Sequence, residues 1–416
     1  MTQAPATPAP SSARALLASP VPGTGGRVEA LDVLRGIAIL GTLASNIWIF
    51  TASGGLDADT LIPGWLTEVS SWLPNGKFLG LLTIMFGIGL EIQRQAAIRQ
   101  GKRWPGGYPV RAGLLFLDGL LNYIFVVQFD VLRAYALTGL IVAFLLLTSE
   151  RVQWWLIGIF LSIHLTFMTV MAVGGASALP GSDVHLDTLG SDARPGDALA
   201  GTVDPGTGYW DEVRMTVQNL GEGFNLTSEF FTIVLMGLGL FLLGANLYRR
   251  GIFTPARRRL RLWLIGIGFF VALPLDFFLS QSTFADSVFS GHARYGTAFV
   301  VSLGILALVA EFYQYRRPGF IGRQLAAVGT MALTCYLLQN IIGVLVQRNL
   351  ITPGYLDGVD STLVTYVSFA VISLILVVFS RLWLSKFSRG PFELAWNWSY
   401  RRILGEGRAK KAQVPA

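Results

Sequence analysis

The stretch "LDVLRGIAILGTLASNIWIF", residues 31–50, is long and apolar enough to cross a bilayer, yet it carries three strongly polar side chains. A helix of this length rises about 30 Å, which matches the hydrocarbon thickness of a membrane. Asp32 and Arg35 lie three residues apart near its start, so both are on one helix face and can form an ion pair. Asn46 follows near its end. The stretch therefore predicts a membrane helix with polar groups near both ends.

The rest of the chain has the same character. It has 416 residues, of which 52% are hydrophobic and only 14% are charged, whereas a soluble domain carries about 25% charged residues. Apolar runs of about 20 residues recur, and the alternating pattern of barrel strands is absent. In lipid the backbone N–H and C=O groups must form their hydrogen bonds within the protein, so these runs are expected to be helices. We predict an all-α polytopic membrane bundle with about ten spans, at residues 31–51, 76–93, 110–129, 131–148, 153–173, 226–248, 259–281, 293–315, 325–347 and 361–385.

The charged residues between the spans predict the orientation of the bundle. Segments 94–111, 249–261 and 316–323 and the tail from residue 386 are basic, whereas residues 52–73 and 174–225 are acidic. With ten spans, every basic segment falls on one face, which the positive-inside rule makes cytoplasmic. Both termini are then cytoplasmic. The net charge of +7 follows from this topology and does not predict nucleic-acid binding.

The apolar runs also divide the chain into regions. The acidic loop is too long for a simple connector, and two alternatives stay open: a short interfacial helix around "YWDEVRMTVQNLGEGF", or a disordered loop. We predict a disordered Ala/Pro/Ser/Gly-rich tail at 1–26, spans one to five within 27–173, an external acidic loop at 174–225, spans six to ten within 226–385, and a basic cytoplasmic tail at 386–416.

Many polar residues of the predicted spans fall at one depth, in the outer half of the membrane. Ionisable groups in hydrocarbon are costly and are functional candidates for that reason. Their shared depth favours a hydrated cavity open to the outside, and the alternative is a set of scattered packing contacts. These residues are Asn46, Lys77, Asn122, Asp130, Arg133, His164, Asp276, His292, Arg294, Gln339 and Asn340.

Some of these residues have predicted roles. His292 starts a span beside Arg294 and is our candidate general base, because an imidazole titrates near neutral pH. Asp130 and Arg133 flank the tight turn "VQFD" and are expected to pair. At the other end of the bundle, Arg35 has two possible roles. It either forms an ordinary juxtamembrane ion pair with Asp32, or it binds an anionic group such as phosphate, whose oxygens a planar guanidinium can hydrogen-bond.

Several sequence signatures are missing. The chain has a single cysteine, Cys335, and no Walker loop, G-x-S-x-G elbow, H-E-x-x-H motif or CxxC motif. An ATPase, a zinc protease and a serine hydrolase are therefore disfavoured, and we expect no metal.

Four stretches together resemble a known family. They are "LDVLRGIAILGTLASNI", "FLGLLTIMFGIGLEIQRQ", "FDVLRAYALTGLI" and the end of the chain, "GTMALTCYLLQNIIG" followed by "FSRGPFELAWNWSYRR". The chain resembles the YeiB-like bacterial membrane proteins of domain-of-unknown-function family 418, which implies the bacterial cytoplasmic (inner) membrane. The L-D-x-L-R-G start is also distantly similar to transmembrane acyltransferases, namely acyltransferase family 3 and heparan-alpha-glucosaminide N-acetyltransferase.

The acyltransferase resemblance implies acyl-CoA as a cytoplasmic co-substrate. The acceptor would be a hydroxyl or an amine at the outer face, for example on a lipid-linked or glycan molecule. Arg35 matches the arginine of the shared motif. Two positions depart from the pattern: Asn46 stands where acyltransferase family 3 has a histidine, and Asn122 where many YeiB-like members have one. Asparagine cannot act as a base, which leaves His292 or Asp130 as the substitute, or no catalysis.

Three functions therefore stay open: acyl transfer, transport or export of a small or lipid-linked metabolite, and a non-catalytic scaffold or sensor. The lipid bilayer is the expected partner, and the sequence does not set the oligomeric state. For the first two functions, the residues expected to bind substrate are Arg35, Asn46, Asn122, Arg133, Arg294, Gln339 and Asn340.

Overall fold

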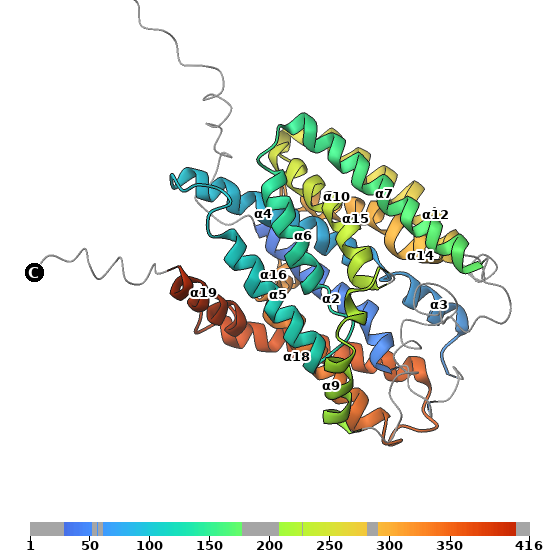
Figure 1. The fold of residues 1–416 in the computed structure, drawn as a ribbon. Coiled ribbons are helices and arrows are strands. Elements are labelled where there is room, and N and C mark those ends of the chain that lie inside the picture. The colour runs from blue at the N-terminus through green and yellow to red at the C-terminus, as the bar shows by residue number, and fades with distance from the viewer. Residues whose placement is uncertain are drawn as a thin grey trace, which may run out of the picture.

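The computed structural model describes residues 29–51, 56, 61–176, 208–226, 228–280 and 290–404. Across these residues the chain is mostly helical and forms one bundle without strands, which confirms the predicted all-α architecture (Figure 1). The predicted N-terminal tail, most of the acidic loop and the last residues of the basic tail lie outside this part of the chain.

Many of the described helices follow one another after connections of only a few residues. Three of the segments, η3, η4 and η5, have π-helical hydrogen bonding inside longer helices. The order is α2 (Glu29–Thr51), α3 (Gly64–Trp72), α4 (Lys77–Arg99), α5 (Tyr108–Phe125), α6 (Leu132–Leu145), α7 (Glu150–Ala176), α9 (Tyr209–Gln218), η1 (Glu222–Phe224), α10 (Glu229–Arg249), η2 (Pro255–Arg257), α11 (Arg258–Gly266), η3 (Ile267–Ala272), α12 (Leu273–Ser280), α14 (Ser290–His292), η4 (Ala293–Thr297), α15 (Ala298–Phe312), α16 (Phe320–Thr330), α17 (Ala332–Val346), η5 (Gln347–Ile351), α18 (Ser361–Leu384) and α19 (Pro391–Ile403).

Within the described residues, seven helical stretches are long and apolar enough to cross a membrane, and an eighth is added if α16 and α17, bent by 87° at their junction, count as one span. These stretches make the protein a multi-pass membrane bundle. The predicted count of ten is not confirmed, because α5 is not among these stretches and α6 has only 14 residues, a rise of about 21 Å.

Helix α2, the stretch that opened the sequence analysis, lies at the centre of the bundle. It packs most closely on α16, where glycines bring the two backbones together. A Cβ atom at Gly36 would overlap the carbonyl oxygen of Leu325, and one at Gly329 would overlap that of Asp32. Small residues at such crossings are typical of membrane helices, whose association depends on close packing.

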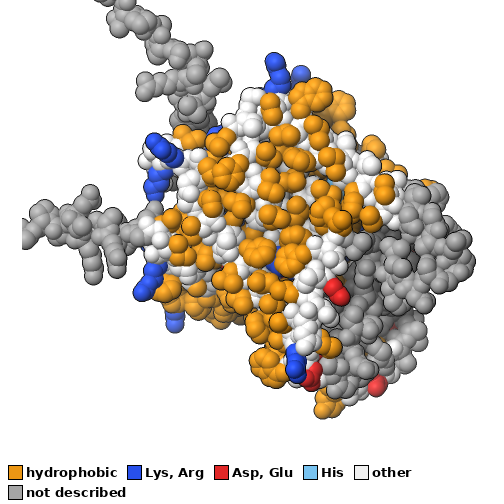
Figure 2. Space-filling model, viewed as in Figure 1, with side chains coloured by type: hydrophobic (Ala, Val, Ile, Leu, Met, Phe, Trp, Pro, Cys, Tyr) orange, Lys and Arg blue, Asp and Glu red, His pale blue; other side chains and the backbone are white. Residues whose placement is uncertain are grey.

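Charged side chains are unevenly distributed over the bundle. Most of the Lys and Arg side chains visible in Figure 2 lie along one end, the acidic ones lie toward the opposite end, and hydrophobic side chains cover the surface between them. Helices α4 and α10 both finish at the first of these ends, with Arg99 and Arg249. We call it the basic end and the other one the outer end.

The hairpin of α5 and α6 stops short of the outer end. Its tip residues Phe129 and Val131 line the same cavity as Thr42 and Asn46 of α2, which continues to Thr51. At 1.5 Å per residue, the tip therefore lies about 8–14 Å below the end of α2.

Helix α9 lies over the tip of this hairpin. The Tyr209 hydroxyl donates to the carbonyl oxygen of Phe125 (2.8 Å), and the Gln128 amide donates to the Thr216 hydroxyl (2.9 Å). This part of the acidic loop is therefore helical, as one of the two predicted alternatives had it.

Candidate functional site

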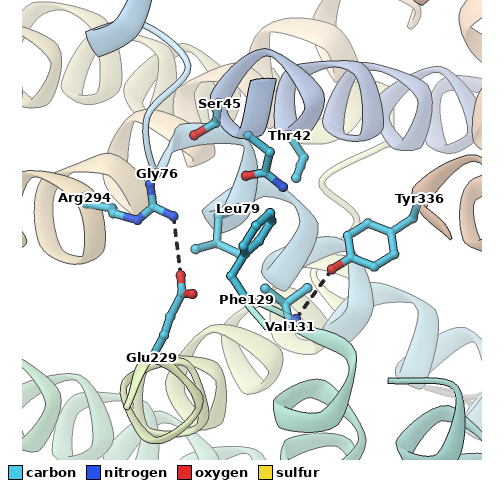
Figure 3. A pocket seen from close by; sticks show the side chains of 10 residues that line it. Thr42, Ser45, Gly76, Leu79, Phe129, Val131, Glu229, Arg294 and Tyr336 are labelled. Carbon is cyan, nitrogen blue, oxygen red and sulfur yellow. Dashed lines mark hydrogen bonds and ion pairs between the residues drawn. The ribbon is translucent and has the colours of Figure 1, made fainter. Parts of the chain in front are cut away.

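A small polar cavity lies in the outer half of the bundle (Figure 3). It has a volume of about 20 Å³, enough for about one water molecule. Helix α2 supplies two hydroxyls and an amide to its wall, and the starts of α4 and α10, the hairpin tip, η4 and α17 supply the rest. The lining residues are Thr42, Ser45, Asn46, Gly76, Leu79, Phe129, Val131, Glu229, Arg294 and Tyr336.

A carboxylate and a guanidinium face each other in this cavity. Arg294 Nη2 lies 3.3 Å from Glu229 Oε1, its Nη1 donates to Asn75 Oδ1 (2.6 Å), and its Nε donates to the Tyr295 hydroxyl (3.0 Å). The Tyr295 hydroxyl in turn donates to Glu229 Oε1 (2.7 Å). Each nitrogen group of the guanidinium thus has a partner, and both charges are held in place before any ligand arrives.

A second polar cluster adjoins the cavity, with the Asp130 carboxylate at its centre. Asn122 Nδ2 donates to Asp130 Oδ1 (3.0 Å), the Tyr336 hydroxyl lies 3.3 Å from the same oxygen, and the Arg133 backbone N–H donates to Oδ2 (3.1 Å). The predicted Asp130–Arg133 ion pair is present but loose, at 3.9 Å, because the guanidinium stacks on the ring of Tyr123 at 3.6 Å. Asp130 therefore fixes the hairpin tip against α17 and does not itself line the cavity.

A third cluster fixes the start of α4 beside the cavity. The Lys77 ammonium forms a fully buried ion pair with the Asp276 carboxylate. Trp72 Nε1 also donates to this carboxylate (2.7 Å), as does the Thr297 hydroxyl (2.8 Å). Both partners were on the sequence-derived list, but their pairing was not predicted. Charges buried in this way are stable only when they are paired and hydrogen-bonded.

Other predicted residues lie apart from the cavity. His292, the candidate base, does not line it, and its Nε2 lies 3.0 Å from the Thr169 hydroxyl of α7. The other histidine in a span, His164, is buried with Nε2 3.0 Å from the Tyr295 carbonyl oxygen. Gln339 and Asn340 are fully buried on α17, outside the lining. Arg35 lies at the basic end, where it pairs with Asp32 at 3.4 Å.

Glu229 is the functional candidate that sequence reasoning missed, together with the hydroxyls of Thr42 and Ser45. The signal for Glu229 was available, because it begins a span at the depth of Arg294. No group of three His, Cys, Asp or Glu side chains in the described part of the chain could hold a metal ion.

The chain is similar to proteins of two bacteria. Residues 247–402 match the family model described as "Protein of unknown function (DUF418)". The chain is 28% identical to the uncharacterized protein YeiB of Escherichia coli (strain K12), over 93% of this chain and 100% of that protein. It is 24% identical to the uncharacterized protein YxaH of Bacillus subtilis (strain 168), over 94% of this chain and 98% of that protein. Residues 247–402 are therefore similar to this family, and the whole chain is similar to YeiB and YxaH.

The DUF418 region contains only part of the cavity. Arg294 and Tyr336 lie inside it, whereas Thr42, Asn46 and Glu229 precede it. The cavity therefore needs residues from inside and from outside the region matched by this family model. No solved structure matches the chain.

Proposed function

We propose that the cavity binds a small polar ligand bearing hydroxyl or amino groups, which enters from the outer face of a bacterial inner membrane. One observation carries this proposal: the Arg294–Glu229 pair lies beside the hydroxyls and the amide of α2 at membrane depth. Because the pair is neutral overall, it suits a hydroxylated or zwitterionic ligand better than a strongly charged one. Convergent polar groups in a concave site are typical of small-molecule binding. At about 20 Å³ the cavity holds about one water molecule, so the helices around it must separate for such a ligand to enter.

We further propose that the reaction is acyl transfer to this ligand. The positive-inside rule assigns the basic end to the cytoplasm, where Arg35 would bind a phosphate of acyl-CoA. Arg35 and Asn46 belong to the same helix and are 11 residues apart, about 16 Å along its axis. Helix α2 would then connect the donor side with the acceptor cavity, as a lipid-linked or glycan acceptor at the outer face requires.

In this mechanism Glu229 replaces His292 as the proton acceptor. The acceptor oxygen or nitrogen attacks the thioester carbonyl, its proton passes to the Glu229 carboxylate, and the CoA thiolate leaves. Glu229 is favoured because its carboxylate lines the cavity, whereas His292 faces α7. Arg294 and Tyr295 hold that carboxylate in position.

Transport of a similar ligand is the second candidate. It is favoured by the 87° bend between α16 and α17 and by the π-helical segment η4, which carries the cavity residue Arg294. Interrupted helices beside a midplane site are typical of secondary transporters. A transporter would release its ligand chemically unchanged.

The first experiment measures acyl-CoA binding and turnover by the purified protein in nanodiscs. Arg35→Ala should weaken binding at least tenfold, since a charge-assisted hydrogen bond is lost. Glu229→Gln should keep binding but lower turnover about 10²–10⁴-fold, the usual contribution of a general base. His292→Ala is the matched control and should retain both.

Other outcomes would reassign the site. Loss of turnover in His292→Ala, with Glu229→Gln active, would restore His292 as the base. If the wild-type protein binds no acyl-CoA of any chain length, acyl transfer is excluded and transport becomes the leading candidate.

A further inference from the structure

Helix α19 is tied closely to the basic end of the bundle (Figure 1). It begins at Pro391, shortly after the membrane-spanning α18 ends at Leu384. The connection is folded back on α18, because Trp383 Nε1 donates to the carbonyl oxygen of Arg389 (2.8 Å) and the Trp383 ring stacks on Phe387 at 4.5 Å. The helix is thus held within a few residues of a membrane span, at the level where a bilayer surface lies.

The inner face of α19 is used within the protein. The Glu393 carboxylate accepts the backbone N–H groups of Leu333 (2.9 Å) and Thr334 (3.2 Å) at the start of α17. The Arg111 guanidinium of α5 lies over the ring of Tyr400, 4.5 Å from its centroid. Since Glu393 is the one acidic residue of α19, the remaining surface of the helix has no carboxylate.

The outer face of α19 combines exposed apolar and basic side chains. Phe392, Trp398 and Ile403 are 43%, 62% and 59% exposed, and Arg401 and Arg402 are exposed beside them. The preceding connection adds the exposed Lys386 and Arg389. The Arg402 guanidinium lies over the ring of Trp398, 5.2 Å from its centroid. A surface that combines aromatic, aliphatic and cationic side chains is typical of helices that lie in the plane of a membrane interface.

We propose that α19 is an interfacial helix that binds the headgroups of anionic phospholipids. Its arginines pair with lipid phosphates, and its exposed rings enter the boundary between headgroups and acyl chains. The charge of this face favours an anionic partner, and the adjoining span α18 places the helix at the bilayer already. This inference does not depend on the ligand or the reaction proposed for the cavity.

A short series of contacts connects α19 with the cavity. Glu393 holds Leu333 and Thr334, and Tyr336, two residues further along α17, lines the cavity and contacts Asp130. Anchoring α19 in anionic lipid therefore steadies the helix that carries Tyr336.

The test compares hydrogen exchange of residues 386–404 in the full protein reconstituted in two kinds of nanodisc. One kind contains only phosphatidylcholine, and the other also contains about one third phosphatidylglycerol. We expect the α19 amides to exchange about tenfold more slowly in the anionic discs, and the difference to shrink in high salt. The double variant Arg401→Gln/Arg402→Gln should lose the difference.

A matched pair at the same end of the protein provides the control. Arg316 and Arg317 are also adjacent and exposed but lie outside α19, so Arg316→Gln/Arg317→Gln should keep the difference. Equal exchange of wild-type α19 in both discs would overturn the proposal, as would equal loss in the two double variants. The wild-type comparison decides the question even if a variant fails to fold.

Discussion

The two ends of the α2 helix differ in how they are packed. Near the basic end, glycine contacts bring α2 and α16 together backbone to backbone at Gly36 and Gly329. Toward the outer end, α2 instead faces side chains that carry charge or hydroxyl groups, and a cavity remains between them. One helix therefore packs backbone to backbone against a neighbour at one end and forms the wall of a cavity at the other.

The largest effect is expected from breaking the buried ion pair beside the cavity. Asp276→Leu would leave the Lys77 ammonium buried without its partner, which typically costs about 3–5 kcal/mol. The double variant Lys77→Met/Asp276→Leu should recover most of that loss. The measurement is the unfolding midpoint in one detergent, with Glu150→Gln, which removes an exposed pair with Arg250, as a control of little effect. A single variant as stable as the wild-type protein would show that the pair is not needed at this end.

A smaller effect is expected at the contact between α2 and α16, where Gly36 and Gly329 lie. Gly329→Ala adds a methyl group against the Asp32 carbonyl, and overpacking of this kind costs about 1–3 kcal/mol. Gly113→Ala in α5 is the matched control, because nothing lies within 4 Å of the added methyl and alanine favours the helix. The unfolding midpoint should fall for the first variant and stay or rise for the second. Equal midpoints would mean that α16 can move away from α2 at little cost.

The smallest effect is expected where α9 covers the hairpin tip. Tyr209→Phe removes one exposed hydrogen bond to Phe125, worth about 1 kcal/mol. Hydrogen exchange across α9 should therefore accelerate about fivefold, while the unfolding midpoint stays unchanged. Tyr355→Phe, at an exposed tyrosine, should change neither quantity. A fall in the global midpoint would instead make α9 part of the core.

Sequence reasoning predicted the helical architecture, but only two of the eleven polar residues that it placed at one depth, Asn46 and Arg294, line the cavity. Apolar runs and charge placement predicted the helical bundle, and the shared depth of Asn46 and Arg294 anticipated that both would line one cavity. The Asp130–Arg133 pairing was also predicted, since it depends only on a tight turn.

Position around each helix was not predictable in the same way. His292 and Arg294 share a depth, but side chains two residues apart on a helix do not face the same neighbour, so only Arg294 reaches the cavity. The π-helical turn at η4 changes the helical period there, which a pattern of 3.6 residues per turn does not anticipate. The pairing of Lys77 with Asp276 depends on contacts between distant segments, which one sequence does not reveal.

The central place of α2 also has a consequence for biogenesis. This helix leaves the ribosome first among the membrane helices described, yet its tightest partner, α16, is synthesised only near the end of the chain. Until then the start of α2 at Asp32 has no α16 packed against it in the bilayer, where polar groups are costly. A nascent chain of this kind depends on the insertion machinery to shelter its first helix, and truncations that remove α16 should be recognised and degraded as orphaned membrane segments.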